Sequence, residues 1–261
     1  MDCNTACITI TFGDVAENGV GMQKIGEEQK CKFKVSYLRK LAAKIEGAKI
    51  YNLVTKSKVR ETFELFKPNK ACVLVISNYS RAMAKLDKDM DAPKAKALYK
   101  ELIRLKWDTK GLMKGKVKNK LARHNLCFAD FQQKPRYDKG RGRVYNFSKL
   151  PLLQQTRESI KKLVKMDSLV AEGNLYYDVT KCGIGYHGDT ERNVAIGLRL
   201  GAPINLYFRY YHKSVAVSKR VKIQLKAGDL YIMSKEAVGK DWRKTSKLTL
   251  RHAAGCEKYT A

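Results

Sequence analysis

The sequence lacks any pair of cysteines in Cys-x-x-Cys spacing, although it contains seven cysteines. An odd number of cysteines at irregular intervals is not typical of a disulfide framework, and the missing pairs exclude a zinc knuckle as well. Cys3 and Cys7 stand close enough to share a metal ion, but reduced thiols scattered through a core explain the pattern better. We therefore expect neither structural disulfides nor a cysteine-based metal site.

Long apolar segments and nucleotide-binding loops are also missing. No run of eighteen apolar residues occurs, and residues 1–12 hold neither a basic nor an apolar leader region. We therefore expect no membrane span, no signal peptide and an intracellular location, in the nucleus or the cytoplasm. Gly19, Gly21 and Gly26 are not spaced as a phosphate-binding loop, and no Gly-Lys-Ser or Gly-Lys-Thr follows them.

Acidic residues are scarce: 25 Asp and Glu stand against 53 Lys and Arg, which gives a formal net charge of +28. This excess goes beyond what solubility needs and predicts a polyanionic partner, most simply nucleic acid, with an anionic membrane surface as the alternative. Between Lys94 and Arg123, eleven basic residues accompany only two acidic ones, Glu101 and Asp108. For a single helix, a solvated basic face would explain such a run.

The basic cluster continues to Arg143, and aromatic residues are interleaved with it. Cations that neutralise phosphates beside rings that stack on bases are what a protein needs to bind a single strand or a flipped base. We therefore predict that this segment contacts DNA or RNA. The residues predicted to bind nucleic acid are Lys114, Lys116, Lys118, Lys120, Arg123, Arg136, Arg141 and Arg143.

The order of the predicted elements favours an α+β fold in three regions. Residues 1–90 alternate strand and helix patterns and form a small α/β region of unknown role, and residues 91–165 form a basic helical segment. Residues 166–261 contain short strands at intervals of about ten residues, as in a sandwich or barrel. The predicted strands are 8–12, 49–54, 71–76, 175–179, 194–200, 204–210, 221–225, 230–233 and 248–252, and the predicted helices are 35–45, 57–66 and 94–107.

One short motif points to a metal. His187-Gly-Asp189 follows a strand pattern punctuated by glycines, and His252 stands sixty-three residues beyond the aspartate. Two imidazoles and one carboxylate on one side of a cation leave the opposite positions free, as in the facial triad of non-haem Fe(II) oxygenases. The tripeptide alone is weak evidence, because a histidine packed at a strand end beside a solvated aspartate has the same sequence.

The sequence around this motif resembles a known family. Residues 177–191 resemble the stretch that carries the iron ligands in AlkB-like 2-oxoglutarate/Fe(II) dioxygenases, and residues 195–201, 206–209 and 225–233 are similar to successive strands of that family's double-stranded β-helix, or jelly roll. Residues 123–130 and 150–153 are similar to the family's substrate lid. The resemblance covers roughly residues 120–256, whereas the first ninety residues match nothing in the family.

The resemblance implies that His187, Asp189 and His252 hold Fe(II) and that 2-oxoglutarate is the cosubstrate. It implies hydroxylation of a C–H bond, which on an N-methyl group of a nucleic acid amounts to demethylation. Two alternatives remain: a protein or small-molecule hydroxylase on the same fold, and a catalytically inactive, basic nucleic-acid-binding protein. The sequence indicates neither the choice between DNA and RNA nor the oligomeric state.

The C-terminal end departs from the family pattern. The family's usual distal histidine is followed by a strand with an arginine for 2-oxoglutarate, whereas here Arg251 and His252 are adjacent. Neighbouring residues of a strand point to opposite faces, so both cannot face one cavity without a bulge. We favour His252 as the ligand. Arg199 is then the first candidate for the cosubstrate carboxylate, because it interrupts an apolar strand.

Arg251 and Arg209 remain alternatives for that carboxylate, and Tyr177 is the candidate for a phenol hydrogen bond to the cosubstrate. Near the motif, Glu191 is interpreted as a turn residue or a support for the ligands. Trp242 is interpreted as a packing or rim residue.

Overall fold

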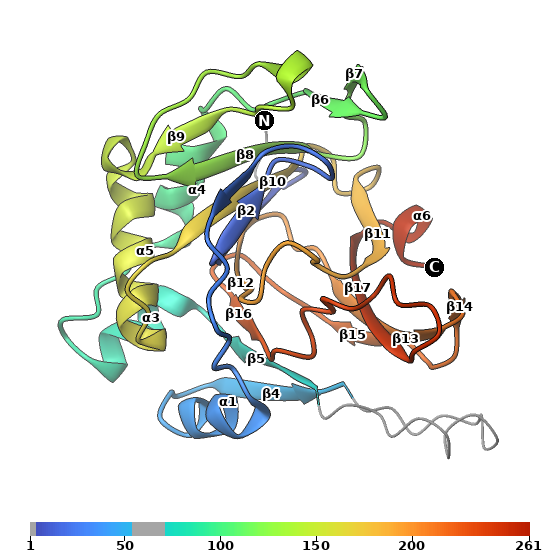
Figure 1. The fold of residues 1–261 in the computed structure, drawn as a ribbon. Coiled ribbons are helices and arrows are strands. Elements are labelled where there is room, and N and C mark those ends of the chain that lie inside the picture. The colour runs from blue at the N-terminus through green and yellow to red at the C-terminus, as the bar shows by residue number, and fades with distance from the viewer. Residues whose placement is uncertain (1–3, 54–70) are drawn as a thin grey trace.

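The computed structural model describes residues 4–53 and 71–261, which form two main β-sheets with helices on one side (Figure 1). The fold is mostly β-sheet with few helices, and its curled sheets are compatible with a β-sandwich or jelly roll. The helix predicted at 57–66 lies outside the described residues. None of the described helices is long and apolar enough to cross a bilayer.

The larger sheet has eight strands, which we call the large sheet. Its strands are β1 (Cys7–Gly13), β4 (Ala48–Asn52), β5 (Cys72–Ile76), β8 (His124–Ala129), β9 (Val144–Asn146), β10 (Val170–Tyr176), β12 (Ile196–Gly201) and β16 (Leu230–Met233). Their order in space is β4-β5-β16-β12-β1-β10-β8-β9. Every neighbouring pair is antiparallel except β8 and β9.

The other main sheet has five strands, which we call the small sheet. Its strands are β11 (Gly183–His187), β13 (Leu206–His212), β14 (Val215–Ala216), β15 (Val221–Ile223) and β17 (Thr249–Gly255). β17 lies between β11 and β13, and both β14 and β15 pair with β13. Two hairpins complete the strands: β2 (Val15–Glu17) with β3 (Lys24–Gly26), and β6 (Lys110–Met113) with β7 (Lys116–Asn119).

Helices cover the outer face of the large sheet. They are α1 (Val35–Ala42), α3 (Tyr79–Leu86), α4 (Ala95–Ile103) and α5 (Pro151–Val164), with α6 (Glu257–Thr260) against the small sheet and single 3-10 turns at η1 (Tyr137–Lys139) and η2 (Phe147–Lys149). In Figure 1, α3, α4 and α5 stand together on the left, and the small sheet lies on the right. None of the helices in residues 4–53 and 71–261 lies between the two sheets.

Strict alternation along β1 shows how the large sheet uses its two faces. Ile8, Ile10 and Phe12 are buried in the main core under the helices. Thr9 and Thr11 point the opposite way and line a cavity between the sheets. At β1 the outer face of the large sheet is therefore apolar, while its inner face carries polar groups.

The chain crosses between the sheets repeatedly after residue 170. β10, β12 and β16 belong to the large sheet, whereas β11, β13 and β17 belong to the small one. β1 lies between β10 and β12 in the large sheet, in the place that β17 occupies between β11 and β13 in the small sheet. A strand from the N-terminal part of the chain is thus a central strand of the fold.

The three regions predicted from the sequence share the large sheet. β1, β4 and β5 come from residues 1–90, β8 and β9 from residues 91–165, and β10, β12 and β16 from the last region. The predicted boundaries at residues 90 and 165 therefore do not divide the structure into separate sheets. The apolar patterns predicted β1, β4, β5, β12 and β16, but they missed β8 and β9, and the strand predicted at 175–179 overlaps only the end of β10. The patterns also carry no information about which strands become neighbours.

Candidate metal centre

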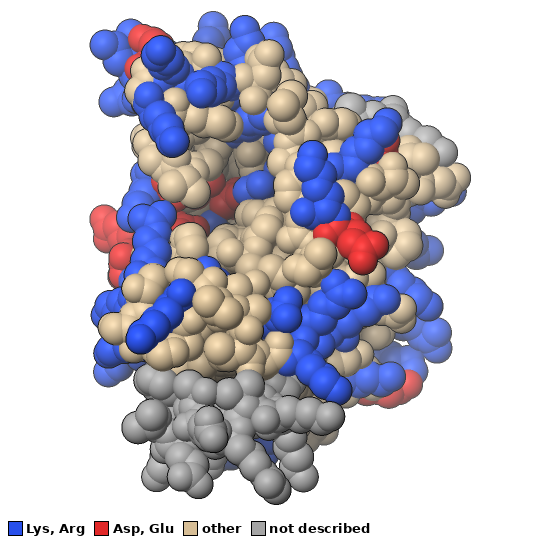
Figure 2. Space-filling view, turned by 90° about the vertical axis from the view of Figure 1, so that its right-hand side faces the viewer, with Lys and Arg blue, Asp and Glu red and all other residues tan. Residues whose placement is uncertain are grey.

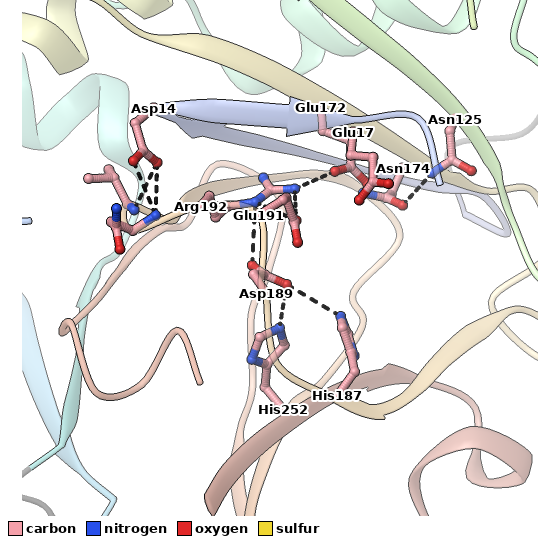
Figure 3. Close-up of polar contacts among 12 residues, drawn as sticks. Asp14, Glu17, Asn125, Glu172, Asn174, His187, Asp189, Glu191, Arg192 and His252 are labelled. Atoms are coloured by element: carbon pink, nitrogen blue, oxygen red, sulfur yellow. Dashed lines mark hydrogen bonds and ion pairs between the residues drawn. The ribbon is translucent and has the colours of Figure 1, made fainter. Parts of the chain in front are cut away.

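Three predicted ligands meet between the sheets. His187 ends β11 and is the cross-strand neighbour of His252 on β17, while Asp189 follows two residues after β11. The Asp189 Oδ1 atom lies 3.6 Å from His187 Nε2 and 3.4 Å from His252 Nε2, as Figure 3 shows. Both distances are long for a hydrogen bond. They suit ligands of one ion, because metal–ligand bonds of about 2.1 Å place neighbouring ligand atoms about 3 to 3.5 Å apart.

Backbone contacts hold the ligands in place. The Nδ1–H of His187 donates to the Gly185 carbonyl at 2.7 Å, so the lone pair of Nε2 faces the other two ligands. The Asp189 amide donates to the Val238 carbonyl at 3.0 Å. Gly188 sits between the two ligands, where a Cβ atom would lie 2.0 Å from the Gly239 carbonyl oxygen. This close approach explains why glycine separates the histidine and the aspartate.

A buried ionic network stands behind Asp189. Arg192 lies 3.6 Å from Asp189 Oδ2 through its Nε, and its Nη2 reaches Glu172 at 2.5 Å and Glu191 at 2.8 Å. The two oxygens of Asp189 are thus divided: Oδ1 faces the histidines and Oδ2 faces the arginine (Figure 3). This arrangement orients the carboxylate toward a shared ion.

The electrostatics favour the protonation states that bind a metal. Burial alone would raise the pKa of Asp189, but His252 and Arg192 outweigh it, so the pKa lies below its usual range. Burial first, and then the neighbouring His252, lower the pKa of His187 to about 3. An ionised carboxylate beside a neutral imidazole is the state in which these side chains bind cations.

The donor set fits a divalent first-row metal. Two imidazole nitrogens and one carboxylate oxygen lie within 4.8 Å of one another, and the group opens into a cavity of about 510 Å³. A set of two imidazoles and one carboxylate with positions left free on one side suits several such ions, including Fe(II) and Zn(II). Figure 2 shows the molecule's surface hollowed, with acidic side chains inside the hollow and Lys and Arg around it.

Arg199 is the cation on the opposite wall of the cavity. Its side chain is 1% exposed, and one Nη donates to the hydroxyl of Thr9, its cross-strand neighbour on β1. Within the described part of the chain, no carboxylate lies at ion-pair distance from Arg199, and its Nε has no hydrogen-bond partner. A buried guanidinium without an anion is costly, so this wall is suited to a carboxylate.

Comparison with known proteins identifies one full-length relative. No protein-family model matches the chain. "Uncharacterized protein R156" of Acanthamoeba polyphaga mimivirus is 44% identical over 253 residues, which make up 97% of this chain and 96% of the viral protein. The chain belongs to the family of this viral protein. That name assigns no activity to the viral protein, so the function is inferred from the geometry of the site.

The other predicted cosubstrate residues lie outside the cavity. Arg251 occupies the face of β17 opposite to His252 and stacks on the rings of Tyr211, at 4.4 Å, and Trp242, at 5.3 Å. The Tyr177 hydroxyl donates to the Leu121 carbonyl at 2.6 Å, and its ring stacks on His124. Both placements argue against contact with a cosubstrate at the metal centre.

Most residues predicted to bind nucleic acid are on the surface. Lys114, Lys116 and Lys118 are exposed on the β6–β7 hairpin, Arg136 and Arg141 are exposed near η1, and Arg123 lines the cavity. Arg143 is partly buried and lies 3.6 Å from Asp108.

Lys120 is the exception and requires a correction. It is buried, and its Nζ donates to the Asn18 carbonyl, the Asn18 side chain and the Asn125 side chain at 2.6 to 3.0 Å. A phosphate cannot reach a lysine whose donors are already used inside the fold. In a lysine-rich run, the sequence pattern does not reveal which lysine is enclosed.

Sequence reasoning missed the residues that support the ligands. Arg192 and Glu172 are central to the network, and the sequence indicates neither of them. The interpretation of Glu191 as a turn residue or a support agrees with its ion pair to Arg192. Arg192 follows Asp189 by three residues, which is the one local signal available. Glu172 comes from β10, and no local pattern links it to the motif.

Proposed function

We propose that the protein is an AlkB-like, Fe(II)- and 2-oxoglutarate-dependent dioxygenase that oxidises a nucleic-acid substrate and removes a methyl group from it. The observation that carries the proposal is one cavity with two complementary walls. His187, Asp189 and His252 converge on one wall, and the buried guanidinium of Arg199 lies on the other without a carboxylate partner among the described residues.

The path of the chain supports a double-stranded β-helix for this protein. From β10 to β13 successive strands alternate between the two sheets, and after β14 and β15 the alternation resumes with β16 and β17, which supports such a fold. We propose that β1 fills the position of the arginine strand that the family pattern places after the distal histidine. β1 carries Thr9 where that strand would face the cavity, and the neighbouring β12 supplies Arg199 in register with it. This exchange accounts for the departure seen at the C-terminal end of the sequence.

Each residue has a specific task in this proposal. When bound, iron and 2-oxoglutarate supply the oxidising chemistry, and the chain positions them and the target. His187, Asp189 and His252 hold the metal, and Arg192 keeps Asp189 turned toward it. Arg199 and the Thr9 hydroxyl bind the carboxylate of the cosubstrate far from the metal. Because the side chain of Arg199 is buried, this carboxylate is held away from water.

The surface charge supports a nucleic-acid substrate. Lysines and arginines surround the hollow in Figure 2, and Arg123 extends the basic surface to the wall of the metal-centre cavity. Phosphates are the anions that such an extended basic surface binds in general.

The decisive experiment is an anaerobic titration with Fe(II) and 2-oxoglutarate. We expect the metal-to-ligand absorption band of the ternary complex in the wild-type protein and its loss in His187→Ala, Asp189→Ala and His252→Ala. Arg199→Met should retain Fe(II) but weaken 2-oxoglutarate binding by roughly one to two powers of ten, because a hydrogen-bonded charge pair is lost. Arg251→Met is the matched control and should bind 2-oxoglutarate normally. A wild-type protein without the band contradicts the proposal.

Salt dependence tests the substrate class. Binding of an oligonucleotide should weaken steeply between about 50 and 200 mM salt, because phosphate contacts release counterions. Turnover of a small-molecule substrate should hardly change over that range. If the enzyme is active and its affinity for the substrate does not depend on salt, the substrate is a small molecule rather than a nucleic acid.

A further inference from the structure

A second cavity adjoins the metal-centre cavity and has exposed apolar walls. It measures about 280 Å³ and shares Gly19, Val20 and Arg123 with the larger cavity. Val20 and Leu121 line it although each is 77% exposed, and Met113 adds a third apolar side chain that is 40% exposed. Large apolar side chains gathered around a concave surface mark a binding site more often than chance exposure does.

A buried polar network ties the two walls of this groove together. Val20 belongs to the turn between β2 and β3, whereas Leu121 follows β7. Beneath them, Lys120 donates to the carbonyl of Asn18 at 2.7 Å and to the side chain of Asn125 at 3.0 Å. Asn18 in turn donates to Asp108 at 3.0 Å. The groove is therefore built before any ligand arrives, which lowers the entropic cost of binding.

The charged side chains of the β6–β7 hairpin, which forms one wall of the groove, are all basic. Lys110, Lys114, Lys116 and Lys118 are exposed on the β6–β7 hairpin, and none of them forms an ion pair with a carboxylate in the described residues. The acidic residue closest in sequence, Asp108, is fully buried and accepts hydrogen bonds from Asn18 and Tyr137. An apolar slot beside free ammonium groups matches an unpaired nucleobase and its phosphates.

We infer that this groove binds the nucleobase next to the one that enters the metal-centre cavity. Val20, Met113 and Leu121 contact the flat face of that base, and the hairpin lysines bind the phosphates on either side of it. The shared wall formed by Val20 and Arg123 places the two bases on one strand. The inference rests on the proposed nucleic-acid substrate, but it requires neither iron nor 2-oxoglutarate.

The test measures binding of labelled single-stranded DNA and RNA of about ten nucleotides by fluorescence anisotropy, without metal or cosubstrate. The double variant Val20→Ser, Leu121→Ser should weaken binding roughly tenfold at every salt concentration, because it removes apolar contact and no charge. Replacing Lys114, Lys116 and Lys118 by Gln should instead lower the slope of log K against log salt by about 2, at about 0.7 per phosphate. The control is Val215→Ser, an apolar residue on β14 that is 63% exposed and should not matter.

An oligonucleotide without bases identifies what the groove recognises. The loss caused by Val20→Ser and Leu121→Ser should vanish on this abasic strand, while the effect of the lysines should remain. Equal binding by the double variant and the wild type, or an undiminished loss on the abasic strand, overturns the inference. If no oligonucleotide binds the wild type, both the inference about the groove and the proposed nucleic-acid substrate are overturned. The Fe(II) titration still tests the metal centre independently. Binding with the expected losses but without the absorption band supports the groove and overturns the oxygenase.

Discussion

Replacing Arg192 by methionine tests the ionic network behind the candidate metal centre. The arginine side chain is 4% exposed and is the cation between Glu172, Glu191 and Asp189. Breaking a buried pair by removing one partner costs about 3 to 5 kcal/mol, because the other charge stays buried without compensation. Domains of this kind unfold with about 5 to 15 kcal/mol in all. Arg192→Met should therefore lose a large part of its stability.

The assay is urea unfolding followed by circular dichroism, with an exposed ion pair as the control. Lys85 and Glu46 lie 2.7 Å apart, but their side chains are 43% and 72% exposed. Lys85→Met should therefore cost at most about 1 kcal/mol, despite the short distance. Adding Glu172→Gln to Arg192→Met should recover part of the loss, because one uncompensated charge disappears.

An unfolding free energy of Arg192→Met within about 1 kcal/mol of the wild type would contradict this expectation, since the network would then behave like a surface pair. A second contradicting result would be that Glu172→Gln leaves the arginine variant no more stable. That result would mean that the carboxylates are held by contacts other than the arginine.

Three further predictions concern packing and charge. Burial lowers the pKa of Lys120 from 10.5 to about 8, so the unfolded chain binds more protons than the folded chain between these two pH values. The unfolding free energy of the wild type, relative to that of Lys120→Met, should therefore rise from pH 8 to pH 10. Urea titrations in which this difference stays flat or falls contradict the prediction. Gly197→Ala places a Cβ atom 2.0 Å from the Tyr231 ring and should lower the melting temperature, whereas Gly185→Ala, with its nearest contact at 3.8 Å, should be mild; equal shifts would show that the ring moves aside freely. Deleting residues 1–13 removes β1 from between β10 and β12 and should abolish cooperative thermal unfolding, and a deletion variant that still melts in one transition contradicts the central position of this strand.

Local patterns predicted some strands closely and missed others, such as β8 and β9. The strand expected at 8–12 is observed as Cys7–Gly13, and the one expected at 230–233 is observed as Leu230–Met233. Both contain apolar residues that pack in the cores, and such residues can be recognised without knowledge of the partners. The helix expected at 94–107 ends earlier, at Ile103, so its boundary was less well predicted than its existence.

Which side chains are exposed was harder to predict than which residues form strands. Lys120 stands in the same run as Lys114, Lys116 and Lys118, yet only Lys120 is enclosed. Its burial depends on Asn18 and Asn125, and the first of these comes from a hairpin about a hundred residues away in the sequence.

The sequence by itself determined the types of residue at the candidate metal centre and the alternation of side chains along the last strand. Because side chains alternate along a regular strand, His252 and Arg251 face opposite ways unless a bulge intervenes. The tertiary structure decided which of the two faces the cavity, and it brought Arg199 beside Thr9 and Glu172 beside Arg192. These contacts join segments of different strands, and the pairing of strands depends on the packing of the entire sheet rather than on any local pattern.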